Sequence, residues 1–180
     1  MTTVAYDGSS IAADALSCAD NERMPNDSRK IMAYRIPKQL GPGHGGPEEV
    51  GQRVIIGFAG HRSFAAKLLE HYIKSPRVMG TTPAIMGKGE ATLLIYQVDD
   101  GEAYMMPYDG GSTRITGQKM AIGSGRAYAL GAMEHGASSF DAVKVAEKLD
   151  VFTRGLYWID LEKLVDGSGE PVNFPWWENA

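Results

Sequence analysis

The chain has 180 residues and a formal net charge of −4, from 18 basic and 22 acidic side chains. This length fits one domain, residues 1–180, and the charge excludes nucleic-acid binding through bulk basicity. A single cysteine, Cys18, excludes an internal disulfide and a multi-cysteine zinc site. No apolar run approaches the roughly 18 residues of a membrane span, and the start shows no export signal. We therefore expect a cytoplasmic protein with no nucleic-acid or membrane partner.

The first half of the chain is expected to form strands around one helix. Asp7-Gly8 is a strong turn signal between two β-favouring segments, which predicts a hairpin. The helix is indicated by a stripe of apolar residues at Phe64, Leu68 and Tyr72. In chain order, we predict strands at 2–6, 9–14, 30–36 and 54–60 and a helix at 63–72, with a loop at 15–27 and a Gly/Pro-rich insertion at 37–51.

The second half is expected to contain a further hairpin and two consecutive helices. Ser138 followed by Asp141 resembles a capping box and predicts the start of the second of these helices, and Gly136 predicts the end of the first. In chain order, we predict strands at 91–98, 102–108 and 119–122, helices at 126–135 and 138–149, and a strand at 156–164, with an irregular stretch at 76–90. This order favours an α+β layered sandwich in which helices cover antiparallel sheets.

Cofactor and metal sites find no support in the sequence. The glycines of residues 41–46 have the spacing of a dinucleotide-binding loop, but Pro42 interrupts them and a strand follows instead of the required helix. The four histidines are His44, His61, His71 and His135, and they lack the spacing of metal ligands. We expect neither a cofactor nor a metal ion.

The start of the chain offers an N-terminal nucleophile. An initiator methionine before a small residue is normally removed, which would leave Thr2 with a free α-amine. A threonine hydroxyl is a weak nucleophile unless a base lies beside it, and its own amine, with an ordinary pKa of about 7.7–8.0, can be that base. A nearby cation would lower the pKa of this amine and keep it neutral at working pH.

Two other residues fit this chemistry if the first hairpin forms as expected. With the turn centred on Gly8, Asp14 lies opposite Thr2. Lys30 begins the next predicted strand and is expected beside both. Taken singly, Asp14 also fits a turn-capping role and Lys30 a solvated surface position, so only the combination points to a catalytic group.

Five sequence segments resemble a known family. They occur in the order seen in proteasome β subunits and the bacterial HslV peptidase. The sequence as a whole is most similar to short proteasome-like proteins of bacteria and their phages. The resemblance runs from Thr2 to Leu164. The segments are Thr2-Thr3-Val4-Ala5-Tyr6-Asp7-Gly8, Ile11-Ala12-Ala13-Asp14, Arg29-Lys30-Ile31, Gly57-Phe58-Ala59-Gly60 and Ala121-Ile122-Gly123-Ser124-Gly125, and Asp150-Val151-Phe152-Thr153 continues the order.

The resemblance implies the four-layer αββα sandwich of the N-terminal nucleophile (Ntn) hydrolases. It also implies that Thr2 is both nucleophile and base, and that Lys30, held by Asp14, lowers the pKa of the Thr2 amine. The backbone N–H of Gly60 would donate to the oxyanion of the tetrahedral intermediate.

The remaining residues implied by the resemblance are Ser124, Asp150 and Thr153, which would orient the amine and the hydrolytic water. The expected function is that of a threonine-type endopeptidase of a self-compartmentalising ring. Its expected partners are a peptide or unfolded protein substrate and further copies of the chain in stacked rings, and docking of an ATP-dependent unfoldase stays open. Two alternatives also stay open: a non-catalytic ring or scaffold subunit, and an Ntn amidase acting on a small-molecule amide.

Overall fold

The computed structural model describes residues 2–16, 18–19, 22–23, 29–36, 51–74, 91–108 and 111–175. In this part of the chain, most strands belong to two five-stranded antiparallel sheets. The N-terminal sheet contains, in spatial order, β10 (Met120–Gly123), β1 (Thr3–Tyr6), β2 (Ser10–Ala13), β11 (Tyr157–Asp160) and β12 (Val165–Asp166). The central sheet contains β5 (Ile31–Ile36), β6 (Gln52–Gly60), β7 (Ala91–Gln97), β8 (Glu102–Pro107) and β9 (Thr113–Arg114).

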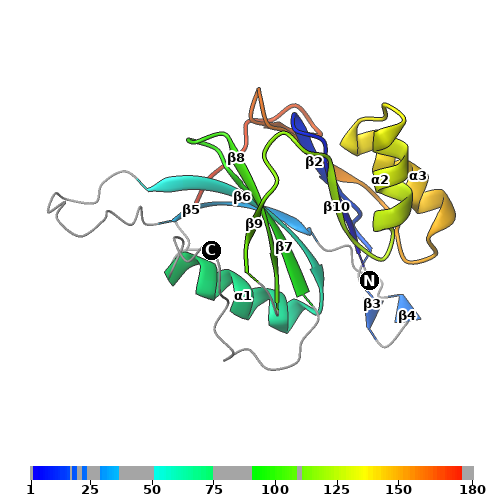
Figure 1. Ribbon diagram of the computed structural model, residues 1–180, viewed down its shortest axis with the longest axis horizontal. Helices are drawn as coiled ribbons and strands as arrows, with labels where there is room; N and C mark the ends of the chain where they lie inside the picture. The colour runs from blue at the N-terminus through cyan, green and yellow to red at the C-terminus, as the bar shows by residue number, and fades with distance from the viewer. Residues whose placement is uncertain are drawn as a thin grey trace, which may run out of the picture.

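Three helices and a small hairpin complete the described elements. The hairpin pairs β3 (Cys18–Ala19) with β4 (Glu22–Arg23). The helices are α1 (Arg62–Lys74), α2 (Arg126–Glu134) and α3 (Ser139–Leu149). Figure 1 shows α2 and α3 side by side against the N-terminal sheet, and α1 on the far side of the molecule against the central sheet.

The alternation of side chains along the strands explains why the two sheets stack. Val4 in β1 and Ile11 in β2 face the central sheet. They pack in one core with Ile55 and Leu94 of that sheet. The intervening residues face the helices, where small side chains let α2 and α3 approach closely. This second core comprises Ala5, Ala12, Ala121, Ala129, Met133, Ala142, Val143 and Ala146. A third core joins α1 to the other face of the central sheet.

The first hairpin has a tighter turn than the sequence suggested. Val4 pairs with Ala13 and Tyr6 with Ile11, and Asp7 N–H donates to Ser10 O, which leaves two turn residues, Gly8 and Ser9. Gly8 has φ +100°, a backbone conformation that glycine adopts without steric cost. The expected turn centre at Gly8 is therefore wrong. The turn is centred between Gly8 and Ser9, and each residue of the first strand pairs one residue further along the second strand than expected.

Most predicted elements are confirmed, and the differences concern short strands. The predicted strand at 156–164 is β11 followed by a turn that leads into β12. The small hairpin β3–β4 lies within the predicted loop at 15–27, and β9 was not predicted at all. These strands are two residues long except for β11, and two residues carry too little alternation to indicate a strand.

The expected four-layer αββα sandwich is wrong. The structure is mostly β, with two antiparallel five-stranded sheets and three helices among the described residues. Among the described helices, α2 and α3 contact the N-terminal sheet and α1 contacts the central sheet. The longest strands are β6 and β7. Consecutive residues in each are buried, because these strands pack against other elements on both faces of the central sheet.

Some sequence-based predictions lie outside the described residues. The insertion predicted at 37–51 does so except for Gly51, and so does the irregular stretch predicted at 76–90. The assignment of residues 1–180 to a single domain stays a prediction. Within the described chain, none of the helices is long and apolar enough to cross a membrane.

Candidate active site

Thr2 is buried at the start of β1, between the two sheets and next to β10. It is 3% exposed, and its carbonyl oxygen accepts the Ser124 N–H at 2.8 Å. Thr3 pairs with Asp14 through the Asp14 N–H, which donates to Thr3 O at 3.0 Å. The first hairpin and the end of β10 together fix the backbone of Thr2.

A buried ion pair lies on one side of Thr2. Lys30 Nζ is 2.8 Å from Asp14 Oδ2, and the two side chains are 4% and 0% exposed. Lys30 also donates to the carbonyl of Leu16, while Asp14 accepts the N–H groups of Thr3 and Leu16 at 2.7 and 3.1 Å. Burial raises the pKa of the Asp14 carboxyl above its ordinary value, and the Lys30 ammonium works against that rise. The pair places a positive charge inside the protein with its hydrogen bonds satisfied.

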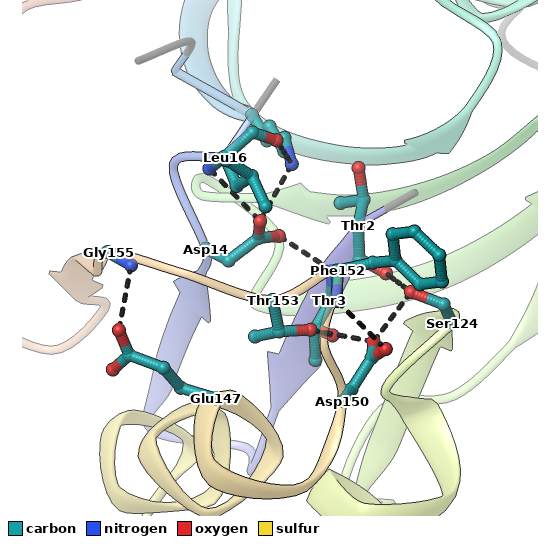
Figure 2. A network of polar contacts seen from close by, with 11 residues as sticks. Thr2, Thr3, Asp14, Leu16, Ser124, Glu147, Asp150, Phe152, Thr153 and Gly155 are labelled. Carbon is teal, nitrogen blue, oxygen red and sulfur yellow. Dashed lines mark hydrogen bonds and ion pairs between the residues drawn. The ribbon is translucent and has the colours of Figure 1, made fainter. Parts of the chain in front are cut away.

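A second polar cluster lies on the other side of Thr2 (Figure 2). Asp150 Oδ2 accepts the hydroxyls of Ser124 at 2.7 Å and Thr153 at 2.9 Å, and Asp150 Oδ1 accepts the Phe152 N–H at 3.1 Å. Burial would raise the pKa of the Asp150 carboxyl, but these three hydrogen bonds outweigh it and lower the pKa. Asp150 is therefore ionised at neutral pH.

The structure thus brings six of the seven predicted site residues together around the start of β1. They are Thr2, Asp14, Lys30, Ser124, Asp150 and Thr153. Figure 2 shows the side chain of Thr2 pointing away from Asp150, with Asp14 to one side and Ser124 to the other. Their catalytic roles stay predictions.

Gly60, the seventh residue, ends β6 on the solvent side of this group. It has φ +101° and is exposed, as is Ser124. A Cβ at Gly123 would lie 3.3 Å from Ala59 Cβ and 1.8 Å from Thr2 O, so the ends of β6 and β10 meet beside Thr2. Gly60 and Ser124, each one residue further along, are exposed, whereas Thr2 itself is buried.

The partner predicted for Asp14 needs correction. Asp14 pairs with Thr3 and not with Thr2, because the turn has two residues and the register shifts by one. Sequence reasoning therefore missed Thr3, whose N–H binds Asp14 and whose hydroxyl lies 2.6 Å from Thr153 Oγ1. It also missed the Leu16 carbonyl, since no side-chain pattern marks a backbone acceptor.

The arrangement combines the buried residue Thr2, a buried cation and an ionised carboxylate that accepts two further hydroxyls. Within the described residues, no group of three or more His, Cys, Asp or Glu side chains could hold a metal ion.

Comparison with solved structures finds a similar fold in a distant neighbour. Anbu (ancestral beta-subunit) from Yersinia bercovieri matches with a TM-score of 0.57 over 88% of this chain and 80% of that chain, at 10% sequence identity. At this identity, the match shows a shared fold. No protein-family model matches the sequence. No curated protein matches it either.

These results correct the identification with proteasome β subunits and the HslV peptidase, and with short proteasome-like proteins. The match reported above is a distant one, to Anbu and not to HslV, and no family model supports the resemblance. The segments that suggested it include most of strands β1, β2 and β10 and the last residues of β6.

Proposed function

We propose that this protein is a threonine-type endopeptidase that uses Thr2 as its nucleophile once Met1 has been removed. The observation that carries the proposal is the buried Lys30–Asp14 ion pair beside the start of β1. A buried charge pair is costly to maintain and adds little net stability compared with apolar packing, so its position next to a candidate nucleophile supports a chemical role.

In the proposed reaction, the Thr2 amine takes the proton of the Thr2 hydroxyl while its oxygen attacks the peptide carbonyl. The tetrahedral intermediate collapses to an ester on Thr2, and the proton passes from the amine to the leaving amine group. A water molecule then hydrolyses the ester with the amine again as base, which releases the acid product and restores the hydroxyl. Lys30 keeps the amine neutral by lowering its pKa, and the Gly60 N–H is the proposed oxyanion donor.

The cluster around Asp150 suits the orientation of the Thr2 amine in the proposed reaction. Ser124 donates its single hydroxyl proton to the carboxylate at 2.7 Å, so the lone pairs of its oxygen remain as acceptors. An acceptor on this side can hold an N–H of the Thr2 amine and direct the nitrogen lone pair toward the hydroxyl. The exposed positions of Ser124 and Gly60 leave room for an extended substrate.

The test starts from the mass of the purified chain, which should lack one methionine. Hydrolysis of fluorogenic peptides should then be abolished by Thr2→Ala and partly retained by Thr2→Ser, because serine keeps both hydroxyl and amine. Thr113→Ala, on the exposed strand β9, is the matched control and should leave the rate unchanged.

Three results would contradict the proposal, and they point to different alternatives. Unchanged hydrolysis in Thr2→Ala would place the nucleophile elsewhere. Retained Met1 with no acylation by a β-lactone would support a non-catalytic scaffold subunit. Hydrolysis of small amides without any cleavage of peptides would support an amidase.

A further inference from the structure

Thr3 is bonded to both polar groups of the candidate site, although its side chain has no assigned role. Its N–H donates to Asp14 Oδ1 at 2.7 Å, on the side of the ion pair. Its hydroxyl lies 2.6 Å from Thr153 Oγ1, on the side of Asp150. The residue is 0% exposed, so water does not compete for either bond.

The direction of the bond between the two hydroxyls follows from proton counting. Each hydroxyl carries one proton, and Thr153 gives its own to Asp150 Oδ2 at 2.9 Å, a carboxylate whose lowered pKa keeps it ionised. Thr153 must then accept from Thr3. The hydrogen bonds therefore run in one direction, from Thr3 to Thr153 and from Thr153 to Asp150.

Gly125 leaves the space that this pair of hydroxyls occupies. A Cβ at Gly125 would lie 2.2 Å from Thr3 Oγ1 and 3.0 Å from Thr153 Oγ1. Its φ of −84° is open to any residue, so the close approach, and not backbone conformation, requires glycine here. Gly131, in the middle of α2, has nothing within 4 Å of its Cβ position.

We propose that Thr3 is a positioning residue whose hydroxyl holds Thr153, and through it Asp150, in place beside Thr2. The inference rests on the proposed function for its catalytic consequence, but the bonded chain itself is independent of that function. Thr3 touches no reacting atom in this scheme. It couples the position of the Asp150 carboxylate to the same backbone that carries Thr2.

The catalytic test compares Thr3→Val, which keeps the branched shape and the N–H, with Thr3→Ser, which keeps the hydroxyl. In Thr3→Val, kcat should fall about ten-fold or more with KM little changed, as expected for loss of a supporting hydrogen bond. The acid limb of the pH–rate profile should also move to higher pH. Without the Thr3 donor, more of the Asp150 charge is uncompensated near the Thr2 amine, which raises the pKa of that amine.

Rescue and matched controls separate this role from a general loss of packing. Thr3→Ser should restore both kcat and the acid limb. Gly125→Ala should reproduce the Thr3→Val effects, while Gly131→Ala, in the same helix, should leave them unchanged. The charged groups of the network are Asp150, Asp14, Lys30 and the Thr2 amine, and none of these substitutions removes one of them.

A double-mutant cycle in chemical denaturation tests the bonded chain without any assay of activity. The loss of unfolding free energy caused by Thr3→Val should be at least halved in an Asp150→Asn background, because the carboxylate that orders the hydroxyls is then absent. Additive losses would overturn the proposal. An unmoved acid limb in an active Thr3→Val enzyme would also overturn it. A wild-type chain that hydrolyses no peptide would refute the proposed function, and the cycle would still decide the link from Thr3 to Asp150.

Discussion

The Lys30 ammonium is bound inside the protein by Asp14 and by the Leu16 carbonyl, and this determines what its removal does. It bonds Asp14 Oδ2 and the Leu16 carbonyl, and Asp14 in turn bonds the N–H of Thr3. Removal of the lysine would leave the Asp14 carboxylate buried without a counter-charge. The same substitution would remove the cation that the proposed reaction needs near the Thr2 amine.

We expect Lys30→Ala to lower peptide hydrolysis by about 100-fold or more. Without the nearby cation, the pKa of the Thr2 amine rises, and the amine is then mostly protonated at neutral pH and cannot act as the base. The free energy of unfolding should fall by about 3–5 kcal/mol, as for other broken buried pairs. Lys30→Arg keeps the charge but should restore the rate poorly, because a planar guanidinium does not replace a compact ammonium. Steady-state kinetics and urea denaturation measure both effects.

Lys163→Ala is the matched control for this experiment. Lys163 pairs with Asp160 at 3.3 Å, but its side chain is 75% exposed. Its loss should change stability by less than about 0.5 kcal/mol and leave the rate unchanged. Hydrolysis by Lys30→Ala at the wild-type rate would refute the assigned roles of Lys30 and Asp14.

Individual site residues were predictable to the extent that their chemistry is unusual. Thr2, Asp14 and Lys30 combine a hydroxyl, a carboxylate and an ammonium near the start of the chain, and the structure pairs Asp14 with Lys30 and buries all three. Thr3 was not predictable, because its role depends on a register that a turn of two or three residues decides. Contacts between distant residues, such as Thr3 with Thr153, leave no local pattern in one sequence.

Among the elements, the first hairpin is joined to the start of α3 through Asp7 at its turn and through the Ser10 hydroxyl, which lies 2.6 Å from Ser139 Oγ. Asp7 Oδ1 accepts from Ser9 and Ser10, and Asp7 Oδ2 accepts the Ser139 N–H at the start of α3 at 2.6 Å. Burial would raise the pKa of the Asp7 carboxyl, but the hydrogen bonds from Ser139, Ser9 and Ser10 outweigh it and lower the pKa. Asp7 therefore ties the helix to the sheet that carries Thr2.

Asp7→Asn should destabilise the protein by about 1–2 kcal/mol at neutral pH, because an amide cannot accept all of these hydrogen bonds. A carboxyl whose pKa is lowered by folding stabilises the protein above its ordinary value of 3.8, and this contribution is lost as the pH falls through the folded value. The stability difference between wild type and Asp7→Asn should thus shrink on acidification below 3.8. Urea denaturation at neutral and acidic pH measures it.

Asp141→Asn serves as the control, since Asp141 lies in the first turn of the same helix and its side chain is 62% exposed. We expect a change within about 0.5 kcal/mol. A stability difference for Asp7→Asn that is independent of pH would show that its charge contributes nothing.

Elements with a long repeating pattern or a local capping signal were predictable. The Ser138 side chain accepts the Asp141 N–H at 3.1 Å, as the capping-box pattern indicates, and Gly136 follows α2 with φ +94°. The strands β6 and β7 were clear from their apolar content. The strands β9 and β12 are two residues long and depend on their neighbours, so their own residues do not specify them.

At the scale of the whole molecule, the exposed large apolar side chains of the described residues concentrate on one layer. They lie on α2, on α3 and just after α3, and they are Tyr128, Leu130, Leu149 and Val151, exposed by 37–65%. Leu68 and Leu69 on α1 and Met133 on α2 are buried within the chain and take no part in this exposed surface. Trp176 and Trp177 lie outside the described residues.

We propose that copies of the chain assemble through this layer and enclose Thr2, as the expected stacked rings would. Light scattering should then give a mass several times that of the 19.5 kDa subunit. Leu130→Lys combined with Leu149→Lys should reduce that mass, because buried charges oppose association. Lys163→Glu, on the β11–β12 turn, should not. A wild-type monomer across a wide range of concentrations would refute assembly.

The turn at Gly8 and Ser9 is exposed, and the pair that closes it, Asp7 and Ser10, lies four residues from Thr3 and Asp14, about 13 Å at ~3.3 Å per residue. It nevertheless decides which residue stands opposite Asp14, because partners in a hairpin are counted outward from its turn. One added residue must either be absorbed as a bulge at the tip or slide every pair along by one, which turns the carboxylate toward the other face. The length of the turn therefore sets the register of the whole hairpin. A change in that length would alter which residues pair at the site, although the turn contacts no residue of the site.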